Sequence, residues 1–314
     1  MKLFSMVFPG QGSQFVGMLK SLSDSFIIVK EVFEESSEIL KYDLWKLAQE
    51  GPLNILNKTE ITQPAILTAS FAIWKVWNSL SNINPIFMAG HSLGEYSALV
   101  CAKSLNFSDA IKITSLRGKF MQESLKKECA MAAIIGLPCT IIDKICKRIS
   151  IYEFVEIANF NSPMQIIISG YKNSVIKVIK KSKKLGAKYA KLLSVNVPAH
   201  SVLMKPASKK LSYALNKIKI FTPKIKVISS LNVKVQKNPK EIKKNLIKQI
   251  YKPVLWNNTI KYLIEKKIKI FLEVGPGNIL SKLLKSFSQN TNIYGISIQH
   301  PEIIIKESGR YNKL

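Results

Sequence analysis

The pentapeptide Gly90-His-Ser-Leu-Gly94 has the residue types and the spacing of a nucleophile turn. It follows the apolar run 85–89 and precedes a segment, 95–105, that we predict to be helical. Two glycines allow the backbone to bend so sharply that a serine hydroxyl between them stands exposed, with the following amide placed where an oxyanion would form. We therefore expect Ser92 to be a nucleophile and the backbone amide of Leu93 to face its oxyanion.

A serine nucleophile needs a base, and the chain has three histidines. His91 belongs to the turn itself, so its side chain is expected to point away from that of Ser92. His300 is followed by Pro301 in a segment that we predict to be a tail. His200 follows a predicted strand, in a loop of the kind that often carries catalysis. His200 is therefore the candidate base, and a structural, hydrogen-bonded histidine is the alternative.

An acid to complete a Ser-His-acid triad is harder to find. The chain has no aspartate after Asp143, and no acidic residue between Glu156 and Glu241. Glu153 and Glu156 could serve by position alone, but both lie in or next to a predicted strand of an inserted unit. A Ser-His dyad, oriented by a backbone or amide carbonyl, fits the sequence better. Such a dyad transfers acyl groups.

Arginine is rare in this chain, which makes Arg117 a candidate binding residue. Only three of the 47 basic residues are arginine. Arg117 lies in a predicted amphipathic helix, 108–121, with Ser108 as its N-cap. A guanidinium grips a carboxylate through two parallel hydrogen bonds, which lysine cannot reproduce. We expect Arg117 to hold a substrate carboxylate; a structural ion pair is the alternative.

The composition narrows the class of protein. The formal net charge is +27, yet no nucleic-acid recognition motif is present. The charge indicates either a solvated lysine-rich surface or attraction to a polyanionic partner, such as a phosphorylated cofactor or an acidic carrier protein. No segment has the length of a membrane span. The spacing of the four cysteines indicates reduced core thiols and no metal site, so we expect a cytoplasmic protein.

The elements around the turn predict an α/β core with a mostly parallel sheet. Strand 2–8 leads into a glycine-containing turn in which the amide of Gln11 is a second candidate oxyanion donor. A helix over 64–80 is expected to begin with Pro64 in its first turn, which puts Gln63 at a loop-to-helix junction. Further helices and strands alternate along the rest of the chain, as a parallel sheet requires.

Residues 127–197 are predicted to form a separate unit. Their expected elements follow the order β-α-β-β-α-β of a ferredoxin-like subdomain. The core would then comprise residues 1–126 and 198–314. Because the unit lies in sequence between Ser92 and His200, we expect the active site in the cleft between the two.

The sequence resembles the malonyl-CoA:acyl carrier protein transacylase family over residues 3 to about 300. The motifs that carry the resemblance are 8–14, Gln63-Pro64, 90–94, Arg117, 159–163, 198–200, Gln249 with Tyr251, and 273–277. The resemblance implies a hydrolase-like α/β core with a ferredoxin-like insert. It also implies ping-pong transfer of malonyl from malonyl-CoA to the 4'-phosphopantetheine thiol of an acidic holo acyl carrier protein, in fatty-acid synthesis.

The resemblance also implies a role for each site residue. Ser92 would attack the thioester with His200 as base, while the amides of Gln11 and Leu93 hold the oxyanion. The main-chain carbonyl of Gln249 would orient His200. No bound cofactor, metal, membrane or nucleic acid is implied, and a monomer is expected.

The same resemblance makes Arg117 the ligand of the malonyl carboxylate, with Gln63 and Asn161 as possible pocket residues. Two positions depart from the family pattern. Met164 stands where glycine is usual, and Ala199 stands where serine is common. The first could alter a loop at the cleft, and the second could tune the acyl pocket.

Three other functions fit parts of the sequence. A hydrolase would pass the acyl group to water, and an acyltransferase could use another extender unit such as methylmalonyl. A non-catalytic basic protein could bind an anionic carrier or a nucleic acid. Turnover with malonyl-CoA, and its loss without the Ser92 hydroxyl, separates the last of these from an enzyme.

Overall fold

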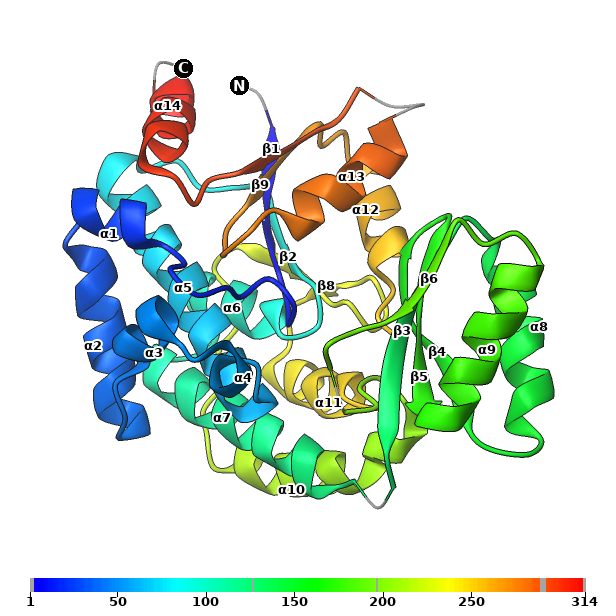
Figure 1. Ribbon diagram of the computed structural model, residues 1–314. Coiled ribbons are helices and arrows are strands. Elements are labelled where there is room, and N and C mark those ends of the chain that lie inside the picture. Colours follow the sequence, from blue (N-terminus) through cyan, green and yellow to red (C-terminus); the bar gives the residue numbers. More distant parts are fainter. Residues whose placement is uncertain (1–2, 126, 196, 289–291, 313–314) are drawn as a thin grey trace.

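The computed structural model describes residues 3–125, 127–195, 197–288 and 292–312 and contains two separate sheets (Figure 1). The larger has the order β10-β9-β1-β2-β7-β8, and every neighbouring pair is parallel except β7 with β8. This confirms the predicted mostly parallel α/β sheet. Its strands are β1 (Phe4–Phe8), β2 (Phe87–Gly90), β7 (Lys226–Ile228), β8 (Val235–Gln236), β9 (Ile270–Glu273) and β10 (Tyr294–Ser297).

Helices cover both faces of this sheet, as the alternation of side chains along β1 requires. Phe4, Met6 and Phe8 belong to one hydrophobic core, and Val7 belongs to the other. The first core includes α2 (Ile28–Leu40), α5 (Thr59–Leu80), α6 (Gly94–Cys101) and α7 (Phe107–Glu123). The second includes α12 (Trp256–Glu265) and α13 (Ile279–Ser288). Both faces of the strands that carry the candidate site are therefore fixed by packing.

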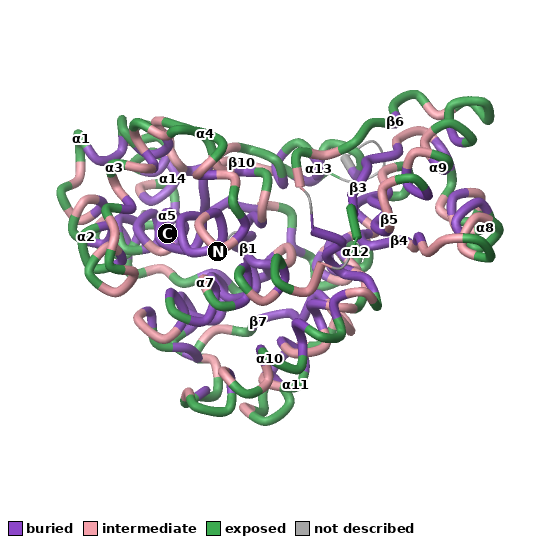
Figure 2. Tube along the Cα trace, turned by 60° about the horizontal axis from the view of Figure 1, so that its bottom comes forward, coloured by how far each residue is buried: buried purple, intermediate pink, exposed green. Residues whose placement is uncertain are grey.

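Helix α5 starts earlier than predicted. It begins at Thr59, so Pro64 lies inside the helix and not in its first turn. Proline removes one backbone hydrogen bond there, but α5 is buried along most of its length (Figure 2), and this burial outweighs that loss. Gln63 is consequently a helical residue, with its side chain inside the protein.

Two other expectations from the sequence were wrong: the N-cap of helix α7, and the structure of the C-terminal segment. Helix α7 begins at Phe107 after Asn106, so Ser108 is a helical residue and not the N-cap. The segment after 292 is no tail: it forms edge strand β10 and then α14 (Pro301–Asn312). Tyr311 of α14 is buried against Phe4, with ring centroids 4.3 Å apart. That contact explains why the last helix folds onto the core.

The remaining helices of the larger part are short or peripheral. They connect the strands, and one of them, α11, ends at Gln249, a residue of the site. They are α1 (Lys20–Ser25), α3 (Leu44–Glu50), α4 (Leu53–Leu56), the 3₁₀ turn Val202–Met204, α10 (Lys205–Asn216) and α11 (Pro239–Gln249).

The smaller sheet is antiparallel and has the order β4-β5-β3-β6. Its elements follow one another as β3 (Cys129–Ile135), α8 (Cys139–Ser150), β4 (Val155–Ser162), β5 (Gln165–Tyr171), α9 (Lys172–Lys184) and β6 (Tyr189–Leu192). Helices α8 and α9 lie on the side of the sheet away from the larger part (Figure 1). This is the predicted ferredoxin-like order. We propose 127–197 as one subdomain, and 1–126 with 198–314 as the other.

Two backbone hydrogen bonds join the small sheet to a loop of the larger part, and we call this connection the seam. Val254 donates a hydrogen bond from its amide to the Ala158 carbonyl, and its own carbonyl accepts one from the Phe160 amide, both at 2.9 Å. Strand β4 is thereby bonded to the loop between α11 and α12. The seam lies only five residues after Gln249.

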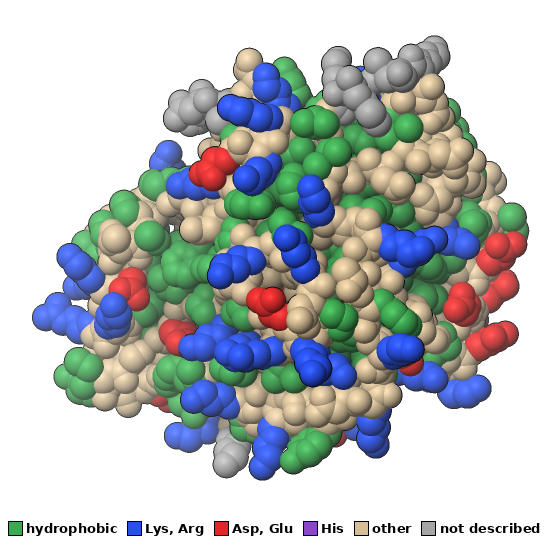
Figure 3. Space-filling view, turned by 180° about the vertical axis from the view of Figure 1, so that it is seen from behind, with side chains coloured by type: hydrophobic (Ala, Val, Ile, Leu, Met, Phe, Trp, Pro, Cys, Tyr) green, Lys and Arg blue, Asp and Glu red, His purple; other side chains and the backbone are tan. Residues whose placement is uncertain are grey.

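The surface is rich in lysine without a single dominant patch on the face shown. Basic side chains are spread over that face, with few acidic ones among them (Figure 3). Among the described residues, no helix is long and apolar enough to cross a membrane. Within the same residues, no three histidine, cysteine, aspartate or glutamate side chains form a possible metal cluster.

Candidate active site

The turn at Ser92 is held by two glycines that cannot be replaced without a clash. A Cβ on Gly90 would lie 2.0 Å from the Glu95 amide nitrogen, and a Cβ on Gly94 would lie 2.0 Å from the Phe8 carbonyl oxygen. Ser92 itself has φ 52°, a left-handed conformation that is strained for serine. β2 and α6 therefore meet so closely that the Ser92 side chain projects from the tip of the turn.

His200 meets Ser92 directly. Its Nε2 lies 2.6 Å from the Ser92 Oγ, and its Nδ1 lies 2.8 Å from the Gln249 carbonyl oxygen. A carbonyl can only accept, so Nδ1 carries the proton and Nε2 accepts the serine hydroxyl. Gln249 is the last residue of α11, where helix carbonyls have no partner within the helix. The end of α11 thus provides the acceptor that no acid provides.

Burial keeps the His200 imidazole neutral. The side chain is inside the protein, and burial together with the nearby Arg117 charge lowers the pKa of His200 to about 3. Hydrogen bonds to backbone carbonyls oppose this shift but do not cancel it. At neutral pH the ring therefore has a free lone pair on Nε2, as a proton acceptor for Ser92 must.

The two acids considered from the sequence lie elsewhere. Glu156 accepts a hydrogen bond from the Val202 amide, and Glu153 accepts one from the Ser174 hydroxyl. Glu95 was not predicted to belong to the site; it is fully buried and accepts a hydrogen bond from the Gln249 side chain. The sequence feature that could have indicated Glu95 is its position directly after the serine motif, on a helix whose other residues are small or apolar.

Arg117 is buried beside Ser92 and donates hydrogen bonds to neutral side chains. It is 2% exposed; its Nη1 donates to the Gln63 Oε1 at 2.6 Å, and its Nη2 lies 3.4 Å from the Ser92 Oγ and 3.3 Å from the Gln249 Oε1. Among the described residues no carboxylate lies within 4 Å of the guanidinium. A buried, unpaired cation is unfavourable, so an anion is its natural ligand.

A close helix crossing sets the position of Arg117. A Cβ on Gly118 would lie 2.5 Å from the Glu60 Cα, so α7 touches the backbone of α5 there. This contact brings Arg117 beside Gln63, whose amide nitrogen is held by the Thr59 hydroxyl at 2.8 Å. Gln63 is therefore a support for the guanidinium.

The two predicted oxyanion amides belong to the segments that follow the neighbouring strands β1 and β2. The Leu93 amide lies at the N-terminus of α6, and Gln11 lies in the loop that follows β1, the strand next to β2. In the described chain neither amide donates a hydrogen bond to another residue. The Gln11 Oε1 accepts from the Thr59 hydroxyl at 2.9 Å, which anchors the loop. Both N–H groups are thus available to a ligand.

A cleft of about 530 Å³ lies between the large sheet's loops and the small sheet. Gln11, His91 and Asn161 line it, and the His91 Nε2 lies 2.8 Å from the Asn161 Oδ1 across it. The His91 ring is thus bonded to Asn161 of β4, and His200 is the histidine that contacts Ser92. Met164 is exposed at the β4–β5 turn, and Ala199 is buried in the core next to His200; neither is among the residues that line the cleft.

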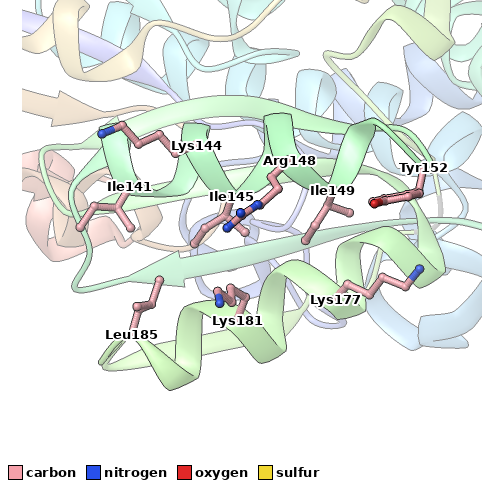
Figure 4. Close-up of a pocket in the computed structure, with 9 residues that line it drawn as sticks. All are labelled: Ile141, Lys144, Ile145, Arg148, Ile149, Tyr152, Lys177, Lys181 and Leu185. Carbon is pink, nitrogen blue, oxygen red and sulfur yellow. The ribbon is translucent and has the colours of Figure 1, made fainter.

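A second hollow, of about 640 Å³, lies between α8 and α9 (Figure 4). Isoleucines of α8 form its apolar side, and lysines from both helices surround it with Arg148. None of the candidate site residues contributes to it. It shares no lining residue with the cleft between the sheets, which His91, the neighbour of Ser92, lines.

Comparison with known proteins defines the class. A family model described as an acyl transferase domain matches residues 5–295. The match includes the serine turn, Arg117, His200 and Gln249. Fold and site together are those of an acyltransferase.

Relatives define the family more narrowly. The malonyl CoA-acyl carrier protein transacylase of Escherichia coli K12 is 47% identical over 91% of this chain and 93% of its own. The structure of the Coxiella burnetii transacylase has a TM-score of 0.96 with 43% identity, covering 98% of both chains. A malonyl-transacylase solved in complex with a type II PKS acyl-carrier protein has a TM-score of 0.95 with 42% identity, over 98% of this chain and 100% of that one. This chain belongs to the malonyl-CoA:acyl carrier protein transacylase family.

Proposed function

We propose that this protein moves the malonyl group from malonyl-CoA to the phosphopantetheine thiol of holo acyl carrier protein, with Ser92 as the covalent carrier. The observation that carries the proposal is the buried Arg117 guanidinium, which has no carboxylate within 4 Å among the described residues and lies 3.4 Å from the Ser92 Oγ. An acyl group with a free carboxylate supplies the missing anion and places its thioester at the serine. The names of the relatives agree with this substrate.

In the first half-reaction His200 takes the Ser92 proton on Nε2 while Oγ attacks the malonyl thioester carbon. The oxyanion that forms lies at the amides of Leu93 and Gln11. The C–S bond then breaks, and the CoA sulfur leaves with the proton from His200. The product is a malonyl ester on Ser92 and a neutral His200.

In the second half-reaction the thiol of the carrier protein replaces CoA. His200 accepts the thiol proton as sulfur attacks the ester carbon, and it returns that proton to the Ser92 oxygen as the ester bond breaks. The Gln249 carbonyl accepts the hydrogen bond from the His200 Nδ1 in both half-reactions. Because this acceptor is uncharged, it suits an imidazole that is neutral before each proton transfer. The same dyad therefore works in both directions.

The cellular setting is part of the proposal. The net charge of +27 favours an acidic carrier protein as partner through long-range attraction. We place the reaction in the cytoplasm, as a supply of malonyl groups for fatty-acid synthesis by a monomeric enzyme. The carrier protein named in the related complex supports the partner.

Intact-protein mass spectrometry tests the proposal. Brief mixing with malonyl-CoA should add one malonyl group to the protein, Ser92→Ala should abolish the adduct, and holo carrier protein should remove it from the wild type. Absence of the adduct and of transfer would refute the proposal. An adduct released as free malonate, despite available carrier, would identify a hydrolase.

Methylmalonyl-CoA in the same assay addresses the closest alternative. Loading of methylmalonyl as fast as malonyl would widen the substrate class without changing the dyad. Binding of the carrier without any turnover would instead favour the non-catalytic alternative.

A further inference from the structure

Glu95 is a fully buried carboxylate that only accepts hydrogen bonds. Its Oε1 accepts from the Gln236 Nε2 at 2.8 Å. Its Oε2 accepts from the Ser230 hydroxyl at 2.7 Å, the Ser230 amide at 3.1 Å and the Gln249 Nε2 at 2.8 Å. Both oxygens are met by donors, which favours the ionised form, while burial, the larger effect, raises the pKa of Glu95. The hydrogen-bond geometry is that of a carboxylate.

The Gln249 side chain connects this anion to Arg117. Its Nε2 donates to Glu95, and its Oε1 accepts from the Arg117 Nη2 at 3.3 Å. A negative charge on the nitrogen side and a positive charge on the oxygen side allow only this orientation of the amide. Nε2 also lies 3.0 Å from the Ser92 carbonyl oxygen, so the same amide touches the serine turn.

The Gln249 amide between Glu95 and Arg117 keeps the two charges from forming a direct ion pair. A carboxylate bound to the guanidinium would neutralise Arg117 and occupy the N–H groups that a substrate carboxylate needs. No compensation at all would leave a cation buried alone. Through Gln249, Glu95 balances the charge from one amide away, and among the described residues the Arg117 Nε has no hydrogen-bond partner.

We propose that Glu95 is a positioning residue for selection of the acyl group: through the Gln249 amide it holds the Arg117 guanidinium beside Ser92 in a state ready for a carboxylate. The inference rests on the proposed function, because it assigns the malonyl carboxylate to Arg117. It gives the acid that follows the serine motif a role in specificity and not in proton transfer to His200.

Glu95→Gln tests the relay, because it keeps the size of the side chain but removes the charge and turns one acceptor into a donor. The rate constant for malonyl loading of Ser92 should fall by about 10- to 100-fold, the usual effect of losing a hydrogen bond to a charged group. Loading of acetyl, which has no carboxylate, should fall less than about threefold. Labelling of Ser92 by a neutral alkyl fluorophosphonate should change as little as acetyl loading.

Two further variants keep the test decisive. Gln249→Met removes the amide but keeps the backbone carbonyl that holds His200, and it should reproduce the loss of malonyl preference even if Glu95→Gln does not fold. Glu273→Gln removes the charge of a second buried glutamate, which accepts from the amides of Leu280 and Ser281. It is the control for damage to a buried network, and its malonyl-to-acetyl ratio should match that of the wild type.

The possible outcomes separate this inference from the proposed function. An unchanged malonyl-to-acetyl ratio in Glu95→Gln, or in Gln249→Met, would overturn the role of Glu95. An equal fall in malonyl loading, acetyl loading and fluorophosphonate labelling would also overturn it, because it would indicate general disruption. A wild type that does not prefer malonyl over acetyl would contradict the proposed function itself.

Discussion

Ser92 and His200 lie 108 residues apart in the sequence, and their side chains meet at 2.6 Å from two left-handed backbone positions. φ is 52° at Ser92 and 61° at His200, values that residues with a Cβ seldom adopt. The strain at Ser92 is held by the contact of β2 with α6, and His200 is tied by its amide to the Ile250 carbonyl. The reacting pair is thus fixed by packing on both sides.

The rate of acyl loading should depend little on pH in the mildly acidic range. Because the pKa of His200 is lowered to about 3, the imidazole stays unprotonated where an ordinary histidine becomes charged. We expect the single-turnover rate of malonyl loading to change less than about threefold between pH 8 and pH 5.5. Rapid-quench measurements across this range check it; an inflection near pH 6.5 would contradict it.

The same shift predicts how stability responds to acid. The folded-state pKa of His200 lies below the unfolded value near 6.5, so the unfolded chain binds the proton first and stability falls as pH drops below about 6.5. His200→Gln removes this contribution, and its free energy of unfolding should therefore fall less on acidification than that of the wild type. Urea unfolding at pH 7 and pH 5 measures the difference. His300→Gln, at an exposed position, is the control.

Arg117→Lys should damage malonyl transfer far more than its conservative nature suggests. Lysine keeps the charge but cannot bond Gln63, Gln249 and a carboxylate in one plane. We expect kcat/KM for malonyl-CoA to fall about 100-fold, with acetyl loading much less affected. Arg148→Lys, at an exposed arginine of α8, should have no effect. Equal activity of the two variants would rule out the carboxylate role.

Gln63→Glu should place a carboxylate of the protein itself on the Arg117 guanidinium. The new carboxylate would stand where the Gln63 Oε1 now lies, 2.6 Å from Nη1, and would pair with the guanidinium. Malonyl loading should fall at least about tenfold while thermal stability is kept or raised. Steady-state kinetics and thermal unfolding measure both. Gln122→Glu, exposed on α7, should leave both unchanged; malonyl loading that survives Gln63→Glu would contradict the assignment.

Gly94→Ala should destabilise the fold, because its Cβ would lie 2.0 Å from the Phe8 carbonyl oxygen. Either β1 or the serine turn must move, at a cost of about 2 kcal/mol or more. Gly309→Ala in α14 is the matched control: a Cβ there meets no atom within 4 Å, and it should stabilise by about 0.5–1 kcal/mol. Denaturant unfolding of both variants gives the comparison. Equal free energies of unfolding for Gly94→Ala and Gly309→Ala would contradict the prediction, because they would show that the serine turn can accommodate the added Cβ.

Local signals explain which parts could be predicted. The serine turn follows from two glycines between a strand and a helix, and the order of the small sheet follows from short apolar runs in sequence. Strand β8 has only two residues and α4 only four, too short for any periodicity to reveal. Helix α14 was missed because its partner, Phe4, lies at the other end of the chain.

The residues of the candidate site also differ in whether local sequence signals could reveal them. Ser92, His200 and Arg117 could be selected because their residue types are rare or carry a motif. Glu95 could not, since an acid in the first turn of a helix is usually a solvated residue that favours the helix dipole. Its burial depends on donors at Ser230 and Gln236, more than 130 residues away, and only the folded chain brings them together.

The seam at Val254 gives the two sheets a mechanical connection. Val254 is bonded to β4 through both its amide and its carbonyl, and it lies only five positions after Gln249, whose carbonyl holds His200. Movement of the small sheet relative to the cleft would strain these two hydrogen bonds. A displacement of β4 acts on the same stretch of backbone that orients the imidazole, so the position of the small sheet and the orientation of the proton acceptor are linked.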